Sequence, residues 1–207
     1  MGFSSAPISP MALLCVFAVT VMISTAFSRS HSRVRPHTHA LTRLLSTSSP
    51  RSGVSDISLT PDEAQAQALD FYYQLSNCTD PLLKSKVSTS LSTLSDGLRL
   101  YGPSCLFSSY NGGKDAVVTM HLLRAAVAKY SHDTGSTHTP QFVYFGIEDE
   151  FPEVEIFLQQ DERRYGLELH RYDQGIAEGL GAHMDAVRGD TGSDNFAFVL
   201  GTRKGDP

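Results

Sequence analysis

The sequence predicts an α/β fold, in which a mostly parallel sheet is flanked by helices and preceded by further helices. After residue 103, short apolar runs alternate with amphipathic stretches, the order that βαβ units and parallel sheets produce. Between residues 60 and 102, apolar side chains recur at helical spacing. The composition, 41% apolar and 19% charged, is that of a globular protein and excludes a disordered chain.

Two helices are expected in residues 56–103. Thr60 and Glu63 form a capping box at the start of the first, and Pro61 suits its first position. The apolar stripe of this helix is expected at Leu69, Tyr72 and Tyr73. The second helix should end near Gly102 and carries one apolar face, formed by Val87, Leu91, Leu94 and Leu98.

The α/β part of the chain, residues 104–207, is expected to hold four strands and three helices. Strands are predicted at 104–110, 141–147, 167–172 and 196–200, and helices at 115–129, 152–165 and 173–187, with a loop at 131–140. The first of these helices should turn three residues inward, Val118, Leu122 and Val127. Because ligands of open parallel sheets bind beyond the carboxyl ends of the strands, a site is expected there.

Residues 1–55 have the composition of a targeting leader. The run 11–27 is uncharged and apolar but short for a membrane span, which is typical of a signal peptide. Residues 28–55 are rich in Arg, Ser, Thr and His and contain no acid, which is typical of a transit peptide. This order resembles the leaders of plastid proteins in algae with secondary plastids, whereas mitochondrial, signal-anchor and cytosolic alternatives stay open. No stable membrane span is expected in the mature protein.

Charge and cysteine content exclude several kinds of protein. The net charge is −5, and all 22 acidic residues follow Ser55 whereas five arginines precede it, so the body is strongly acidic. That argues against nucleic acid as the main partner, because phosphate backbones bind basic faces. The three cysteines are too scattered for a disulfide framework or a zinc site, and Cys105 is expected to be a buried, inert thiol.

The first predicted strand leads through residues 111–115 (NGGKD) directly into a helix. Glycines let the backbone approach an anion closely, and a helix N-terminus directs N–H groups and a positive dipole at it. Lys114 adds a mobile positive charge suited to phosphate. The spacing fits neither a Walker A loop nor a dinucleotide-binding fingerprint. We interpret this segment as a phosphate-binding loop; the alternative is a glycine-rich turn with a solvated Lys-Asp pair.

Charged residues also follow the second and fourth strands. Glu148-Asp149-Glu150 could be a solvated turn, but carboxylates beside a phosphate loop can hold Mg²⁺ against phosphate oxygens. Arg203 is a candidate phosphate clamp because its planar fork binds two oxygens at once, with Asp206 close behind in the sequence. No nucleophile elbow and no metal-ligand histidine spacing occurs, so catalysis by positioning and charge stabilisation is expected.

Four segments, in matching order and spacing, resemble the FAD synthases (FMN adenylyltransferases) related to phosphoadenylyl-sulfate reductase. They are SSYNGGKDAVVTMHLL, YFGIEDEFPEVEIF, YGLELHRYDQGIAEGL and FVLGTRKGDP. The resemblance implies the adenine nucleotide α-hydrolase-like fold of the PP-loop type. It also implies Mg²⁺-dependent transfer of AMP from the substrate ATP to the substrate FMN, which gives FAD and pyrophosphate.

The resemblance also assigns residues to this reaction. It implies catalytic roles for Asp149, which would also be the metal ligand, for Lys114 and for Arg203. It implies an ATP site formed by Tyr110, Asn111, Gly112, Gly113, Lys114, Asp115, Phe145, Ile147, Gly201, Arg203 and Asp206, in which the backbone of 145–147 would meet adenine.

The chain departs from the pattern of this family at two positions. Ala116 replaces the usual cysteine, and Ala177 replaces a lysine that many relatives carry, which would weaken a phosphate contact. No segment is a convincing flavin site, and in the family a further stretch follows the position of Pro207 and completes the flavin pocket. We therefore expect an incomplete catalytic domain that binds ATP weakly and makes little FAD.

Three other functions were weighed. A sulfonucleotide reductase would need a redox-active cysteine, typically in a C-terminal tail. A thiolating or amidotransferase-type ATP pyrophosphatase would more often carry SGGxDS, a pattern that Ala116 breaks. A non-catalytic ATP-binding module is the alternative from a different class. The oligomeric state does not follow from the sequence.

Overall fold

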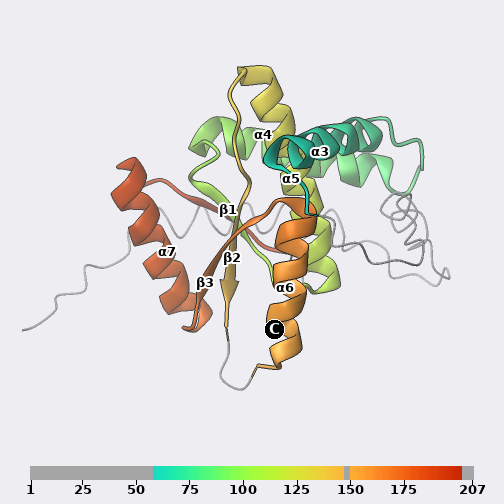
Figure 1. The fold of residues 1–207 in the computed structure, drawn as a ribbon. Coiled ribbons are helices and arrows are strands. Elements are labelled where there is room, and N and C mark those ends of the chain that lie inside the picture. Colours follow the sequence, from blue (N-terminus) through green and yellow to red (C-terminus); the bar gives the residue numbers. More distant parts are fainter. Residues whose placement is uncertain (1–57, 147–149, 202–207) are drawn as a thin grey trace, which may run out of the picture.

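The computed structural model describes residues 58–146 and 150–201 (Figure 1). Helices α3 (Pro61–Ser76) and α4 (Lys84–Tyr101) come first. Strands and helices then alternate, as β1 (Leu106–Ser109), α5 (Lys114–Thr134), β2 (Gln141–Phe145), α6 (Pro152–Tyr165), β3 (Glu168–Tyr172), α7 (Ile176–Thr191) and β4 (Ala197–Val199). The predicted fold class, a sheet flanked by helices and preceded by helices, is confirmed.

The four strands form one sheet in the order β3-β2-β1-β4, and every neighbouring pair is parallel. The chain moves outward from β1 to β2 and β3, then returns across the sheet to place β4 on the other side of β1. Strand order therefore reverses between β1 and β4. In open α/β sheets the crevice at such a reversal, beyond the carboxyl ends of the strands, is where ligands bind.

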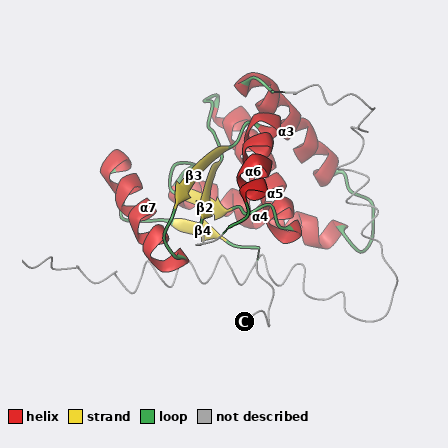
Figure 2. Cartoon of the chain, turned by 60° about the horizontal axis from the view of Figure 1, so that its bottom comes forward, coloured by secondary structure: helices red, strands yellow, loops and turns green. Residues whose placement is uncertain are grey.

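The two faces of the sheet bury different sets of side chains. Leu106, Phe142 and Leu169 face the helices α3 to α6, whereas Phe107 and Val143, the next residues in their strands, face α7. This alternation follows from the two-residue period of a strand. Figures 1 and 2 show the same division, with α7 alone on one side of the sheet and the other helices on the opposite side.

The N-terminus of α3 is confirmed, and of its predicted apolar stripe Tyr72 does pack against the core, but the prediction is wrong for Tyr73. Thr60 and Glu63 form the capping box, and Pro61 is the first helical residue. The buried side chains, however, are Ala64, Ala68 and Leu75, whereas Tyr73 is 42% exposed. A Cβ at Gly166 would lie 2.6 Å from Cβ of Ala64, so this face needs small side chains where the chain after α6 passes.

Helix α4 has the predicted apolar face and ends at Gly102, which has φ +78°. Helix α6 has the predicted bounds. Helix α5 is longer than expected, since it includes residues 131–134 and ends at Gly135 in the left-handed conformation. Helix α7 begins three residues later than expected and continues to Thr191, before Gly192.

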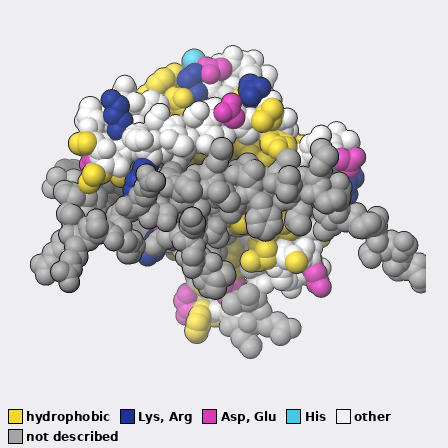
Figure 3. All heavy atoms as spheres, turned by 180° about the vertical axis from the view of Figure 1, so that it is seen from behind, with side chains coloured by type: hydrophobic (Ala, Val, Ile, Leu, Met, Phe, Trp, Pro, Cys, Tyr) yellow, Lys and Arg dark blue, Asp and Glu magenta, His cyan; other side chains and the backbone are white. Residues whose placement is uncertain are grey.

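None of the described helices is long and apolar enough to cross a membrane. The predicted leader, residues 1–55, lies outside the described residues. On the face of the molecule in Figure 3, the described Lys and Arg side chains are scattered among acidic and apolar ones.

Candidate functional site

The turn between β1 and α5 requires glycine at one position. Gly112 has φ +71°, a region that side chains with a Cβ rarely adopt. A Cβ there would also lie 2.5 Å from Cε1 of Phe157, on α6. The backbone N–H of Gly113 donates a hydrogen bond of 3.0 Å to Oδ1 of Asn111, which closes the turn. The loop is therefore a tight backbone curve with α6 packed against it.

The loop leads into the N-terminus of α5. Gly113 is the N-cap and offers no side chain, and the first helical hydrogen bond joins N–H of Val117 to the carbonyl of Gly113 at 2.9 Å. The amides of residues 114–116 consequently have no acceptor within the helix. Such amides and the helix dipole favour an anion. Lys114 is exposed beside them and forms no ion pair within residues 58–146 and 150–201.

The carboxyl end of β4 meets the same helix turn. A Cβ at Gly201 would lie 3.0 Å from the carbonyl oxygen of Asp115 and 3.0 Å from Oγ1 of Thr119. This approach brings the end of β4 against the first turns of α5, opposite the loop that follows β1. The strand-order reversal thus coincides with the predicted phosphate loop, and Asn111, Gly112, Gly113, Lys114, Asp115 and Gly201 are brought together.

The side chain of Tyr110 has a structural role, because it points into the core. It is 1% exposed, packs against Phe142, and its hydroxyl donates a hydrogen bond to Oδ2 of Asp161 on α6. Burial raises the pKa of both groups. Only the backbone of Tyr110 can line the ATP site, and its side chain ties α6 to the base of the loop. The sequence reasoning missed Asp161. The available signal was that an acidic residue stands three positions after the apolar Leu158, on the same face of the helix.

The side chain of Phe145, at the end of β2, also packs in the core. Its ring lies against Tyr172 and Phe198, and a Cβ at Gly179 would lie 2.7 Å from its Cδ1. Gly179 therefore lets α7 approach the sheet closely. The next residue, Gly146, donates its N–H to the carbonyl of Tyr172 at 2.8 Å. Strand β2 therefore ends at the same edge of the sheet as the phosphate loop. An adenine contact was predicted for the backbone at this point.

Several predicted site residues lie outside the described residues: Ile147, Asp149, Arg203 and Asp206. Their roles stay predictions. Among the residues that the structure does describe, no group of three or more His, Cys, Asp or Glu side chains could hold a metal ion.

An exposed apolar rim at the starts of α6 and α7 was missed by the sequence reasoning. Phe151 is 76% exposed, Ile156 55%, Phe157 42% and Ile176 63%. Phe151 and Ile176 follow β2 and β3 at the carboxyl edge of the sheet, and Phe157 contacts the loop at Gly112. The signal available in the sequence was that Ile156 and Phe157 stand between Val154 and Leu158, which gives this helix more apolar residues than one buried stripe needs.

Comparisons with known proteins agree with this geometry. Residues 105–188 match the phosphoadenosine phosphosulfate reductase domain family. A probable FAD synthase of Caenorhabditis elegans is 31% identical over 100 residues, which are 48% of this chain and 18% of that protein. The matched family region begins at the start of β1 and ends within α7, so it contains the loop and the rim.

Solved structures share the fold. An FMN adenylyltransferase of Candida glabrata, in complex with FMN and the ATP analogue AMPCPP, has a TM-score of 0.55 at 20% identity over 73% of this chain and 54% of its own. Yeast FAD synthetase in complex with FAD gives a TM-score of 0.55 at 20% identity, over 72% of this chain and 55% of its own. The chain thus spans about half the length of these solved relatives. Residues 105–188 are thus similar to the phosphoadenosine phosphosulfate reductase domain family, and the chain shares its fold with FMN adenylyltransferases.

Proposed function

We propose that this chain carries the ATP-binding part of an FMN adenylyltransferase, which transfers AMP from ATP to FMN and releases pyrophosphate. The observation that carries the proposal is the loop at residues 111–114, where a positive-φ glycine, the N-terminus of α5 and an exposed lysine meet at the strand-order reversal. The relatives with this fold include structures with FMN and an ATP analogue, and with FAD and inorganic pyrophosphate.

In this reaction a phosphate oxygen of FMN attacks the α-phosphorus of ATP, and the bond from that phosphorus to the β-phosphate oxygen breaks. The protein has to orient the two phosphates and to stabilise negative charge on the leaving pyrophosphate. The amides of residues 114–116 and the ammonium of Lys114 would supply that stabilisation. Positioned donors of this kind act on charge that develops in the transition state.

The sequence after β2 supplies the carboxylates Glu148-Asp149-Glu150, and Mg²⁺ needs only one or two such ligands beside phosphate oxygens and water. Asp149 is the proposed ligand, with Glu148 as the next candidate. When bound, the ion would neutralise part of the charge on the phosphates.

The exposed rim supports a flavin partner. An isoalloxazine ring is large, flat and largely apolar, and aromatic side chains offer it stacking surfaces. Phe157 presents such a surface beside the loop, and Phe151, the N-cap of the same helix, is exposed as well. We propose that the ring of FMN binds at this rim. Replacing Phe157 with alanine should then weaken FMN binding more than ATP binding.

Two measurements on the full chain test the proposal. Calorimetric titration with ATP should show Mg²⁺-dependent binding that Lys114→Ala weakens about tenfold or more. Chromatography should then detect FAD formed from FMN and ATP, at the low level that the sequence leads us to expect. Binding of ATP without FAD formation would assign the chain to nucleotide binding alone, and no binding of ATP would refute the proposal.

Asp149→Asn removes the proposed metal ligand at nearly constant volume. FAD formation should fall tens-fold or more, which corresponds to about 2–4 kcal/mol of barrier. Glu153→Gln, which removes an equal charge from the exposed first turn of α6, is the control and should change turnover little. Near-normal turnover in a folded Asp149→Asn protein would move the assignment to Glu148.

The family match also raises a second candidate, sulfonucleotide reduction. That chemistry uses a thiolate near the nucleotide. In the described part of the chain the cysteines are Cys78 and Cys105. Cys105 is 4% exposed and precedes β1, at the opposite end of the strand from the loop. This placement favours the adenylyltransferase.

A further inference from the structure

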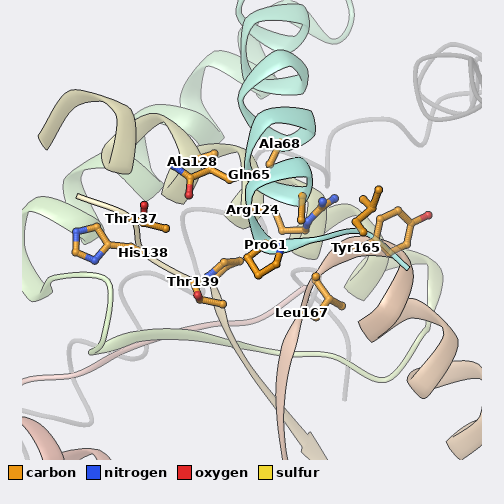
Figure 4. Close-up of a pocket in the computed structure, with 14 residues that line it drawn as sticks. Pro61, Gln65, Ala68, Arg124, Ala128, Thr137, His138, Thr139, Tyr165 and Leu167 are labelled. Carbon is orange, nitrogen blue, oxygen red and sulfur yellow. The ribbon is translucent and has the colours of Figure 1, made fainter. Parts of the chain in front are cut away.

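A cavity of about 250 Å³ lies at the opposite end of the sheet from the phosphate loop. Its walls come from the start of α3, the middle of α5, the loop before β2 and the link between α6 and β3. Figure 4 shows Arg124 and Tyr165 on one side of this cavity and Thr137 and His138 on the other. None of the residues predicted for ATP lines it.

Arg124 is a charged side chain in the wall of this cavity and is only 4% exposed. Its Nη2 donates to Oε1 of Gln67 at 3.2 Å, its Nη1 lies 3.3 Å from Nδ1 of His121, and its Cζ is 5.0 Å from the centre of the Tyr165 ring. All three partners are neutral or aromatic. Across residues 58–146 and 150–201, no carboxylate pairs with Arg124.

Arg124 keeps its positive charge, and the histidine beside it is neutral. Burial lowers the pKa of Arg124 to about 10, so the guanidinium stays charged at neutral pH. His121 is also buried, and burial together with Arg124 and Arg164 lowers its pKa to about 3, so this ring is neutral. A buried cation without a counter-charge is costly, and a ligand carrying negative charge would remove that cost.

We propose that this cavity binds a small organic carboxylate, with the carboxylate on Arg124 and the hydrocarbon body between Pro61, Ala68 and Leu167. A guanidinium and a carboxylate match as planar partners that share two hydrogen bonds. Gln65 and Thr139, which also line the cavity, offer further polar groups near its mouth.

The size and the lining of the cavity select this chemistry. A volume of about 250 Å³ falls below the usual range for drug-sized ligands, roughly 300–1,000 Å³, which favours a compact ligand over a nucleotide. Phosphate carries a second charge, and among the described residues that line the cavity Arg124 is the only Lys or Arg. A monocarboxylate leaves no charge unpaired. The apolar majority of the lining residues suits a short aliphatic or aromatic body.

This site is separate from the proposed ATP site. Arg124 follows Lys114 by ten residues in α5, which places the two about 15 Å apart along the helix axis. The inference does not rest on the adenylyltransferase activity, and carboxylate binding can be measured without ATP or FMN.

The test compares benzoate with its neutral analogue benzamide on the full chain. Benzoate should raise Tm in a saturable way and give a 1:1 calorimetric isotherm, whereas benzamide, of the same shape but uncharged, should bind at least tenfold more weakly. Inorganic phosphate is the third ligand and should also bind more weakly than benzoate. Phosphate binding in preference to benzoate would overturn the choice of a carboxylate.

Two variants locate the site. Arg124→Gln removes the charge and should abolish the preference for benzoate over benzamide. Ala128→Leu keeps Arg124 but fills the cavity, because Ala128 lines it from the next turn of α5, and it should remove benzoate binding while ATP binding persists. If Arg124→Gln does not fold, Ala128→Leu decides. No saturable response to benzoate, or an unchanged one in folded Ala128→Leu protein, would refute the proposal.

Discussion

Replacing Gly112 with alanine would add one methyl group at the point where the phosphate loop touches α6. Gly112 has φ +71°, and a non-glycine residue in that region costs about 1–2 kcal/mol. The new Cβ would also lie 2.5 Å from Cε1 and 2.9 Å from Cδ1 of Phe157. Because the Phe157 side chain is 42% exposed, its ring can swing outward, so we expect this contact to add only about 1 kcal/mol. The free energy of unfolding should fall by about 2–3 kcal/mol in total.

Gly102 provides a matched control. It has φ +78° and ψ 162°, a region that glycine alone adopts readily, and among the described residues no atom beyond its chain neighbours lies within 4 Å of the position of its Cβ. Gly102→Ala therefore carries a conformational cost without a packing cost, about 1–3 kcal/mol. Denaturant unfolding measures both variants, and calorimetry measures their affinity for ATP. Gly112→Ala should lose ATP affinity tens-fold because the loop can no longer curve around a phosphate, whereas Gly102→Ala should bind ATP normally. Adding Phe157→Ala to Gly112→Ala should recover the packing part of the stability but not the affinity. Normal ATP binding by folded Gly112→Ala protein would refute the loop as a phosphate site.

Three further predictions concern stability. Tyr110→Phe leaves the buried carboxylate of Asp161 without its donor, so denaturant unfolding should show a loss of about 2–3 kcal/mol; Asp161→Leu added to it should restore part of that loss, and an undiminished stability in Tyr110→Phe would contradict the role of this pair. The pKa values of His121 and His183 are lowered, to about 3 and about 4, mainly by burial. Both are harder to protonate in the folded than in the unfolded chain, so stability is full above pH 6.5 and should fall by about 2 kcal/mol per histidine at pH 5; a flat profile between pH 7 and pH 5 would contradict this. Deleting residues 1–55, which we propose to be a plastid-targeting leader, should leave Tm within a few degrees, and a large loss would mean that this segment packs on the body.

The order and type of the elements were predictable because periodicity reports burial directly. Alternation after residue 103 revealed the parallel sheet, and the bounds of α6 were marked by Pro152 and Gly166. The polar residues from Ser131 onward predict a loop, but α5 continues to Thr134 and is capped by Gly135. Polar residues show that a segment is exposed to solvent, not that it is a loop. The end of a helix is better predicted from a glycine that can adopt the left-handed conformation at its C-cap.

The residues of the candidate site were predictable to a different degree. The loop glycines and Lys114 could be found because their backbone chemistry is local. The buried role of Tyr110 could not, since it depends on Asp161, 51 residues away. The face of α3 was also wrong at Tyr73, because hydrophobicity favours this residue, whereas packing beside Gly166 favours the small Ala64. The cavity beside Arg124 is formed by four segments that are distant in sequence, so no local sequence pattern could predict it.

The strand order has a consequence for synthesis on the ribosome. β1 receives β2 as a neighbour soon after α5, but its other neighbour, β4, pairs through Leu106 and Ala197 and therefore emerges only at the end of the described chain. Until then one edge of β1 is open, together with Phe107 and the rest of the apolar face that α7 covers. Pairing between segments this distant in sequence is slow, and an open apolar edge invites association with other chains. Chaperone dependence of this protein should therefore be greatest in the interval between the emergence of β2 and the docking of β4.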